Sequence, residues 1–324
     1  MSIVIALDDF IQLVYGNDRN LDDSIRLRIH EVLGKDVVDS IADVRAVTMA
    51  INQLTFPTPL IVRFSAEDIQ FAQVNGIDCP VDRYDISVSA PGAFSGSFEP
   101  HLVACFERIC QPGSVVFDIG ANVGFHSLLL SKLAGDGGLV YSFEPNSENC
   151  RLILLALEHN HISNITLVPV ALSDQRGWAY FSSHIGSNGG FVSQQFVALH
   201  GYGTVVPTFK LDDLSLPNVD VIKVDVEGAE YKVLKGGELL LSRSRPAIIC
   251  EFSMEMVQRV SEVTPAHFLN WITGMDYKIF LLDRDSCKPL PVESVALLFD
   301  SWGSLVRIED LLFLPGEKAD LLDR

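Results

Sequence analysis

Short apolar segments alternate with amphipathic segments over most of the chain after residue 101. The apolar segments are nearly continuous, which is typical of strands buried on both faces of a parallel sheet. The expected strands are 114–118, 139–143, 165–170, 220–225 and 247–252. The helical patterns around them are 124–134, 146–160, 227–242 and 264–274. The pattern therefore predicts a doubly wound α/β domain.

The end of the chain departs from this alternation. Residues 277–283 and 310–315 both have strand patterns with no clear helix between them, so we expect a final antiparallel pair. A further segment, 177–212, lies between the third and fourth strands and has the pattern of short strands and loops.

The first hundred residues have a different pattern of apolar and polar positions. Residues 1–57 show helical periodicity, whereas 60–100 contain short strand-like pieces followed by a stretch rich in Gly, Ser and Pro. We therefore divide the chain into an N-terminal appendage, 1–95, and a cofactor-binding domain, 96–324. The appendage is expected to contribute to substrate recognition or to a homodimer contact.

Composition narrows the class of protein. Apolar residues make up 48% and charged residues 20% of the 324 residues, as in folded globular proteins. The 24 basic and 42 acidic residues give a net charge of −18, which disfavours nucleic acid and anionic membranes as partners. There is no basic leader, no apolar stretch of about 20 residues and no CxxC pair among the six cysteines. We expect a cytoplasmic protein without a membrane span, with reduced, buried thiols and no zinc site.

Candidate chemistry begins in "VVFDIGANVGFHS", where a predicted strand is followed by Gly120 and Gly124. A strand-to-helix turn presents free backbone N–H groups, and glycine lets a ligand approach the chain closely. No Lys-Ser or Lys-Thr follows, which excludes a nucleoside triphosphate loop. Asn122 at the middle position departs from the dinucleotide fingerprint.

Two carboxylates narrow the choice of cofactor. Asp118 ends the strand before the glycines, where it would repel a pyrophosphate but attract the ammonium and sulfonium of S-adenosylmethionine. Glu144, 26 positions later (144 − 118), ends the next strand and can accept both ribose hydroxyls. Asp118 alone could be a helix cap, and Glu144-Pro145 alone an ordinary turn favoured by the helix dipole. Their order and spacing together favour S-adenosylmethionine.

A second acidic motif, "IKVDVEGAE", supplies candidates for catalysis. Asp225 ends the fourth strand, beside the first strand of a doubly wound sheet, and Glu227 follows two residues later. Methyl transfer from S-adenosylmethionine needs alignment of the reacting atoms, and a poor nucleophile such as an alcohol benefits from a base. The candidate bases are His126, Asp225, Glu227 and Glu251, with Asp225 the best single candidate. His126 has the simpler interpretation of a packed or capping residue, and Glu227 that of a helix N-terminal acid.

These motifs resemble the FkbM-type class I S-adenosylmethionine-dependent methyltransferases. The pair D-x-G-A-N-x-G and K-x-D-x-E-G-A-E is specific. The resemblance runs through the segments 96–100, 116–127, 141–149, 170–177, 208–214, 221–237, 245–252 and 310–315.

The resemblance implies a Rossmann-like, seven-stranded, mostly parallel sheet with an antiparallel last strand. It also implies bound S-adenosylmethionine, S-adenosylhomocysteine as product, and Ala171 and Leu172 lining the adenine. The expected cofactor-binding residues are Asp118, Gly120, Ala121, Asn122, Gly124, Glu144, Pro145, Ala171, Leu172 and Asp225. The carboxylates of Asp118, Asp225 and Glu227 could also hold Mg²⁺, but no clear ligand pattern supports a metal, so no metal site is expected.

The leading hypothesis is O-methylation of a hydroxyl on a small molecule, which is a sugar, a glycan or a polyketide-like product. Asp225, Glu227 and His126 are the catalytic candidates. The alternatives are N- or carboxyl-methylation of a small molecule, or a non-catalytic protein that binds S-adenosylmethionine. No sequence motif identifies the acceptor.

Overall fold

The computed structural model describes residues 69–82, 85, 88–183, 187–200, 203–302 and 307–323. The helices predicted within 1–57 and the strand-like piece at 60–64 lie outside the described residues. None of the described helices is long and apolar enough to cross a membrane.

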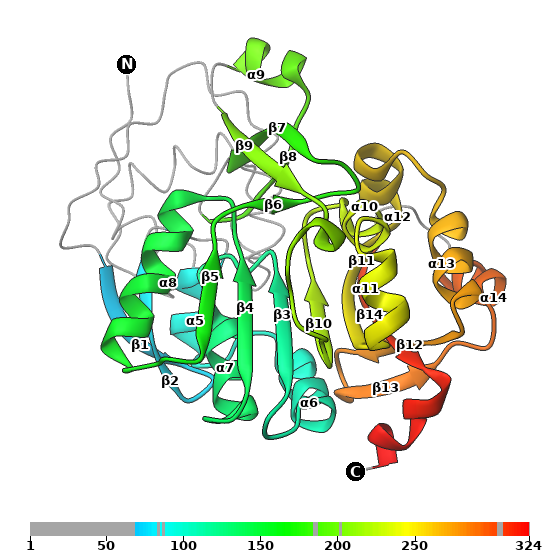
Figure 1. The fold of residues 1–324 in the computed structure, drawn as a ribbon, viewed down its shortest axis with the longest axis horizontal. Coiled ribbons are helices and arrows are strands. Elements are labelled where there is room, and N and C mark those ends of the chain that lie inside the picture. Colours follow the sequence, from blue (N-terminus) through cyan, green and yellow to red (C-terminus); the bar gives the residue numbers. More distant parts are fainter. Residues whose placement is uncertain are drawn as a thin grey trace, which may run out of the picture.

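A central sheet organises the described residues (Figure 1). Its order is β13-β12-β14-β11-β10-β3-β4-β5. The strands are β3 (Val115–Ile119), β4 (Leu139–Phe143), β5 (Ile165–Val168), β10 (Val221–Val224), β11 (Ala247–Ser253), β12 (Tyr277–Asp283), β13 (Lys288–Pro291) and β14 (Ile308–Pro315). The five strands from β11 to β5 in this order are parallel, and β14 is antiparallel to both β11 and β12. The doubly wound fold with an antiparallel last strand is confirmed.

The C-terminal half differs from expectation in three places. β13 returns against β12 as an eighth strand, and its two prolines suit a sheet edge. The prediction of no helix between 283 and 310 was wrong, because α14 (Val295–Trp302) lies there and buries Leu298 and Trp302. The helix predicted at 227–242 is divided into α10 (Glu230–Lys235) and α11 (Glu238–Ser244) by two glycines.

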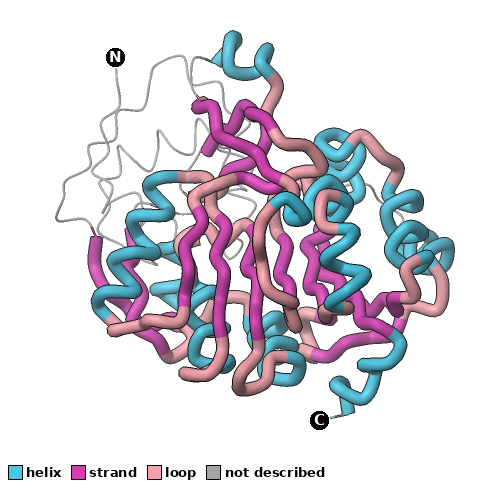
Figure 2. The backbone as a smooth tube through the Cα atoms, viewed as in Figure 1, coloured by secondary structure: helices cyan, strands magenta, loops and turns pink. Residues whose placement is uncertain are grey.

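Helices cover both faces of the sheet (Figure 2). On one face lie α6 (Pro100–Ile109), α7 (Phe125–Ala134) and α8 (Ser147–His159), and on the other lie α10, α11, α13 (Pro265–Gly274) and α14. Successive strand residues enter opposite cores, for example Val116 and Phe117 of β3. This two-sided burial explains why the parallel strands are almost continuously apolar.

A hairpin and a short helix precede the sheet. They are β1 (Ile69–Val74), β2 (Ile77–Asp82) and α5 (Ser89–Ser95). Val74, Cys79 and Val88 share the core of α6 and α7, so this part packs directly on the sheet domain. The strand pattern at β1 is confirmed, whereas α5 and α6 form where the sequence indicated no helix.

The segment 177–212 forms the predicted short strands. A small sheet of order β6-β9-β7-β8 contains β6 (Ala171–Leu172), β7 (Gly177–Ser183), β8 (Gly189–Phe191) and β9 (Thr204–Phe209), with α9 (Gln194–His200) beside it. β6 follows β5 almost directly, so this sheet stands at the carboxyl edge of the central strands (Figure 1). Short helical turns occur at Leu211–Asp213, Met254–Met256, Val257–Ser261 and Gly316–Asp323.

Candidate active site

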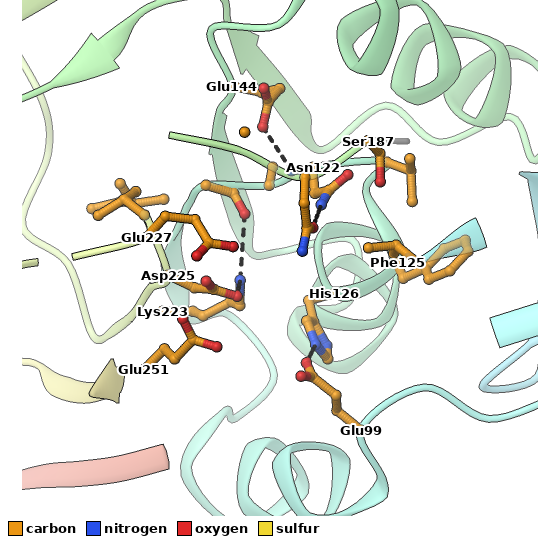
Figure 3. A pocket seen from close by; sticks show the side chains of 18 of the residues that line it. Glu99, Asn122, Phe125, His126, Glu144, Ser187, Lys223, Asp225, Glu227 and Glu251 are labelled. Atoms are coloured by element: carbon orange, nitrogen blue, oxygen red, sulfur yellow. Dashed lines mark hydrogen bonds and ion pairs between the residues drawn. The ribbon is translucent and has the colours of Figure 1, made fainter. Parts of the chain in front are cut away.

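A pocket of about 720 Å³ lies at the carboxyl edge of the central sheet. It is lined by the turns after β3, β4 and β10, by β6 and β8, and by residues of α5 and α6. Open α/β sheets bind ligands at this edge, at the point where the helices change face. Here that point lies between β3 and β10. Figure 3 shows Glu144 at one end of the pocket and Glu99 and Glu251 at the other.

The glycine turn after β3 touches the turn after β10. Gly120 has φ +78°, and a Cβ there would lie only 1.8 Å from the Asp225 carbonyl oxygen. The Asp225 N–H also donates to the Ile119 carbonyl at 3.0 Å. Gly120 is therefore required for contact between two chain segments. Asn122 adopts φ +51°, a left-handed conformation that asparagine tolerates better than most residues.

Asp118 lies beneath the pocket and does not line it. Its side chain is fully buried, and Oδ2 accepts a hydrogen bond from Ser127 Oγ at 2.5 Å. Oδ1 is 3.8 Å from Lys223 Nζ. The contact between Asp118 and a cationic cofactor stays a prediction, while the observed contacts connect Asp118 to α7 and to Lys223.

Lys223 is a buried cation to which the sequence motifs assigned no role. Its Nζ is 3.0 Å from Asp225 Oδ2 and 3.4 Å from the Gly120 carbonyl oxygen. Burial opposes its charge, but Asp225, Asp118 and Glu99 together raise the Lys223 pKa above its ordinary value. Lys223 thus bridges the turns after β3 and β10. A lysine inside an otherwise apolar strand, "VIKV", was the signal for it.

Glu144 closes one end of the pocket. Its carboxylate accepts hydrogen bonds from the backbone N–H groups of Asn122 and Asn146, both at 2.8 Å. Burial raises the Glu144 pKa to about 7, in spite of these hydrogen bonds. Pro145, Ala121, Ala171 and Leu172 line the pocket with it, as does Gly120.

Two buried polar atoms near this end have no hydrogen-bond partner among the described residues. They are Asn122 Oδ1 and Ser187 Oγ, and both residues line the pocket. Asn122 Nδ2 donates to Asn188 Oδ1 at 2.7 Å, which joins the glycine turn to the segment before β8. Buried polar atoms without partners are uncommon, so a ligand rich in hydroxyl and amino groups fits this end.

Asp225, Glu227 and Glu251 form an acidic wall near Lys223 (Figure 3). Burial raises the pKa of all three carboxyl groups, and their mutual repulsion adds to the effect for Glu227 and Glu251. The pKa of Glu227 is raised to about 7. Glu227 also has φ +55°, a strained conformation of the kind that clusters at functional sites.

Glu230 supports the backbone of the turn after β10. It is 1% exposed, and its Oε1 accepts hydrogen bonds from the N–H groups of Val226 and Gly228, both at 3.0 Å. Glu230 therefore holds the turn that carries Glu227, and it does not line the pocket.

His126 lines the pocket but is tied to Glu99. Its Nε2 is 2.7 Å from Glu99 Oε2, and its Nδ1 is buried with no partner among the described residues. The aromatic rings of Phe98 and Phe106 pack around the imidazole. Burial opposes ionisation of Glu99, but the hydrogen bond from His126 and nearby positive charges lower the Glu99 pKa to about 2. This packed arrangement agrees with the simpler interpretation of His126, and Glu99 was not assigned from the sequence.

The described residues contain no group of three or more His, Cys, Asp or Glu side chains arranged to hold a metal ion. All six cysteines are free, and five of them are buried.

Two curated proteins are similar to part of this chain. Hexuronic acid methyltransferase AglP of Haloferax volcanii is 33% identical over 145 residues, covering 43% of this chain and 56% of that protein. Protein-L-isoaspartate O-methyltransferase of Methanococcoides burtonii is 31% identical over 107 residues, covering 32% and 48%. The chain thus spans about half the length of the curated relatives it matches.

Solved structures give more distant matches. Methyltransferase FkbM from Methylobacillus flagellatus has a TM-score of 0.39 and 18% identity, covering 62% of this chain and 43% of that one. M. jannaschii TYW2 in complex with AdoMet has a TM-score of 0.42 and 12% identity, covering 78% and 88%.

The family model described as the methyltransferase FkbM domain matches residues 118–279. The match begins at Asp118, contains the glycine turn and Glu144, and continues through the β10 turn to β12. It covers 162 residues (279 − 118 + 1), half of the 324 in the chain. The chain belongs to the FkbM methyltransferase family.

Proposed function

We propose that this protein is an S-adenosylmethionine-dependent methyltransferase that methylates a hydroxyl group of a small molecule, a sugar in the first instance. The observation that carries the proposal is the convergence of the glycine turn, Glu144 and the Asp225–Glu227 turn on one pocket. Family membership supports the reaction class. The name of the archaeal relative, a hexuronic acid methyltransferase, supports a sugar acceptor.

In this proposal the cofactor occupies the Glu144 end of the pocket. Glu144 accepts hydrogen bonds from the ribose, Ala171 and Leu172 contact the adenine, and Asn122 Oδ1 gains a partner. When bound, S-adenosylmethionine would supply a sulfonium-linked methyl group for in-line transfer to the acceptor oxygen, with S-adenosylhomocysteine as product. The remaining cofactor contacts are assigned to Gly120, Ala121, Pro145 and Asp225, which line the pocket, whereas Gly124 lies outside the lining as the N-cap of α7. Asp118 acts through Ser127 and Lys223.

The acidic wall supplies the base. A carboxyl group with a pKa of about 7, as at Glu227, is partly ionised at neutral pH and is well matched to accept the acceptor's hydroxyl proton. Asp225 is the second candidate, held by Lys223 at 3.0 Å. His126 has one ring nitrogen on Glu99 and the other enclosed, so we assign it to positioning Glu99.

The segment before the sheet domain is proposed to shape the acceptor pocket. Val88, Pro91 and Ser95 all line the pocket, and all three belong to the 1–95 appendage. A homodimer contact through this appendage stays a prediction.

Calorimetric titration of the purified protein with S-adenosylmethionine and, separately, with NAD tests the cofactor. We expect one site for S-adenosylmethionine and none for NAD. Glu144→Gln should weaken the affinity about tenfold, because it removes a carboxylate from the ribose position. Glu148→Gln, on the exposed side of α8, is the matched control and should leave the affinity unchanged. Saturation by NAD without binding of S-adenosylmethionine would refute the proposal.

A methyl-transfer screen with labelled donor tests the acceptor. Neutral sugars, uronic acids, lipids and polyketides are offered in parallel, together with amines as controls for N-methylation. We expect label on a hydroxyl oxygen. Label found only on nitrogen or on a carboxylate would contradict O-methylation.

A further inference from the structure

A buried charged cluster lies beside the pocket, away from the proposed cofactor end. We call it the Arg284 cluster, made of Arg284, Asp310 and His101. Asp310 is 3% exposed, and its Oδ2 lies 2.7 Å from both Arg284 Nη2 and His101 Nε2. His101 is 4% exposed, so the carboxylate is held from two sides in the interior.

The strand register places this cluster next to Glu251. Asp310 of β14 is the direct antiparallel partner of Glu251 of β11, so the two side chains emerge on the same face of the sheet. His101 follows Glu99 by two residues at the start of α6. Glu99 and Glu251 mark the end of the pocket opposite Glu144 in Figure 3, and Arg284 and His101 line the same pocket.

The sheet topology divides the pocket into two halves. The β3–β4–β5 half carries the glycine turn and Glu144, where we propose the cofactor. The β11–β14–β12 half carries Glu251, Asp310 and, directly after β12, Arg284. Because all of these residues lie at the carboxyl edge, the second half adjoins the first across β10.

Arg284 has one guanidinium nitrogen held by a carboxylate and another without a partner. Its Nη2 is held by Asp310, whereas its Nε is buried and has no hydrogen-bond partner among the described residues. An arginine held in this way is preorganised, so it loses little conformational freedom when it binds a ligand oxygen. A buried N–H without a partner is unfavourable, and an acceptor oxygen in the pocket would satisfy it.

We propose that the β11–β14–β12 half is the acceptor subsite and that Arg284 donates a hydrogen bond through Nε to an oxygen of a neutral hydroxylated acceptor, such as a pyranoside. This inference rests on the proposed function. A neutral acceptor fits because Asp310 already balances the charge of Arg284, and Asp225 and Asp118 balance that of Lys223. An acceptor carboxylate would instead meet Glu99 and the acidic wall.

Steady-state kinetics with labelled S-adenosylmethionine and a set of methyl glycosides (glucoside, galactoside, mannoside and rhamnoside) test the subsite. With the glycoside that the wild type uses best, Arg284→Met should raise KM at least tenfold, about 1.4 kcal/mol. The Kd for S-adenosylmethionine should stay within twofold. Arg284→Lys keeps the ion pair with Asp310 but lacks Nε, so it should also raise KM. Because the buried charge of Asp310 stays paired, this variant should fold even if Arg284→Met does not. Arg151→Met, on the exposed side of α8, is the control.

The outcomes separate this inference from the proposed function. An unchanged KM in both Arg284 variants, or a loss of S-adenosylmethionine affinity in step with KM, would overturn the assignment of Arg284. A wild type that binds S-adenosylmethionine but methylates none of the glycosides would overturn the pyranoside class. We expect kcat/KM for methyl glucuronide to be at least tenfold lower than for methyl glucoside. Equal kcat/KM values for the two would overturn the assignment of a neutral acceptor. A wild type that does not bind S-adenosylmethionine refutes the proposed function itself.

Discussion

Lys223 sets the charge balance under the pocket. It is 3% exposed and adjoins Asp118 and Asp225, which come from neighbouring strands. Removing one member of a buried ion pair leaves the other charge uncompensated. The proximity of Lys223 lowers the pKa of both Asp225 and Glu227 against the effect of burial. Lys223 therefore keeps the candidate bases closer to ionisation at neutral pH.

Lys223→Met should shift the pH profile of methyl transfer. Without the lysine charge the pKa values of Asp225 and Glu227 rise, so the acid limb of log kcat/KM should move to higher pH by about one unit. The measurement is kcat/KM from pH 5 to pH 9. Lys235→Met removes a lysine from the exposed ion pair that Lys235 of α10 makes with Glu238 of α11, and it should leave the profile in place.

A structural role alone would lower activity at every pH without moving the acid limb, and that result would contradict the prediction. If the methionine variant is too unstable, the double variant Asp118→Asn, Lys223→Met removes the unpaired buried charge as well. It should show the same shift.

The turns after β3 and β10 act as one packed unit. Gly120 of the first turn meets the Asp225 carbonyl of the second, and Lys223 Nζ bonds the Gly120 carbonyl and the Asp225 carboxylate. Displacement of one turn therefore moves residues assigned to the cofactor together with those assigned to the reaction.

Gly120→Ala should separate these turns. The new Cβ would lie 1.8 Å from a carbonyl oxygen, so the backbone must shift, and we expect at least a tenfold loss of S-adenosylmethionine affinity by calorimetry. Gly135→Ala is the matched control: its φ is +65° but a Cβ there meets nothing within 4 Å. Gly135 has ψ −175°, so the control measures the cost of a backbone conformation open mainly to glycine, about 1–3 kcal/mol of stability. Equal cofactor affinity in the two variants would contradict the packing argument.

The parallel strands could be predicted because burial on both faces makes them continuously apolar. Asp225 and Glu144 could be predicted because they directly follow such strands. Glu99 and Arg284 could not, because their surroundings form only on folding: Glu99 meets His126, and Arg284 meets Asp310, which also contacts His101 209 positions away. The division of the 227–242 helix at Gly236 and Gly237 had a local signal, since glycine weakens a helix interior.

A row of polar side chains crosses the middle of the sheet, from β4 to β14, on the α6–α7 face. Ser142 of β4, Asp118 of β3 and Lys223 of β10 are register neighbours, and Glu251 of β11 is paired with Asp310 of β14. Each of these residues is adjacent in sequence to an apolar residue whose side chain packs in the core on the other face of the sheet. The molecule therefore buries a layer of ionisable groups between its sheet and two helices, at the edge where the pocket lies.

This burial predicts how stability depends on pH. The pKa values of Glu144, Glu227 and Glu230 are each raised from 4.5 to about 7 by burial. Between pH 4.5 and pH 7 the folded protein binds more protons than the unfolded chain, so the free energy of unfolding falls as the pH rises through this range. The ligand-free protein should have a higher Tm at pH 5 than at pH 8.

Glu230→Gln isolates one of these groups. Glutamine keeps the Oε1 acceptor for Val226 and Gly228 but cannot ionise, so it removes a penalty of at most about 3 kcal/mol above pH 7. Thermal unfolding should show Tm about 5 °C above wild type at pH 8 and little change at pH 4.5. Glu238→Gln makes the same change in net charge on an exposed part of α11, so it separates local burial from the overall charge of −18. An equal gain in both variants would mean that general repulsion, rather than the buried carboxyl group, governs the pH dependence.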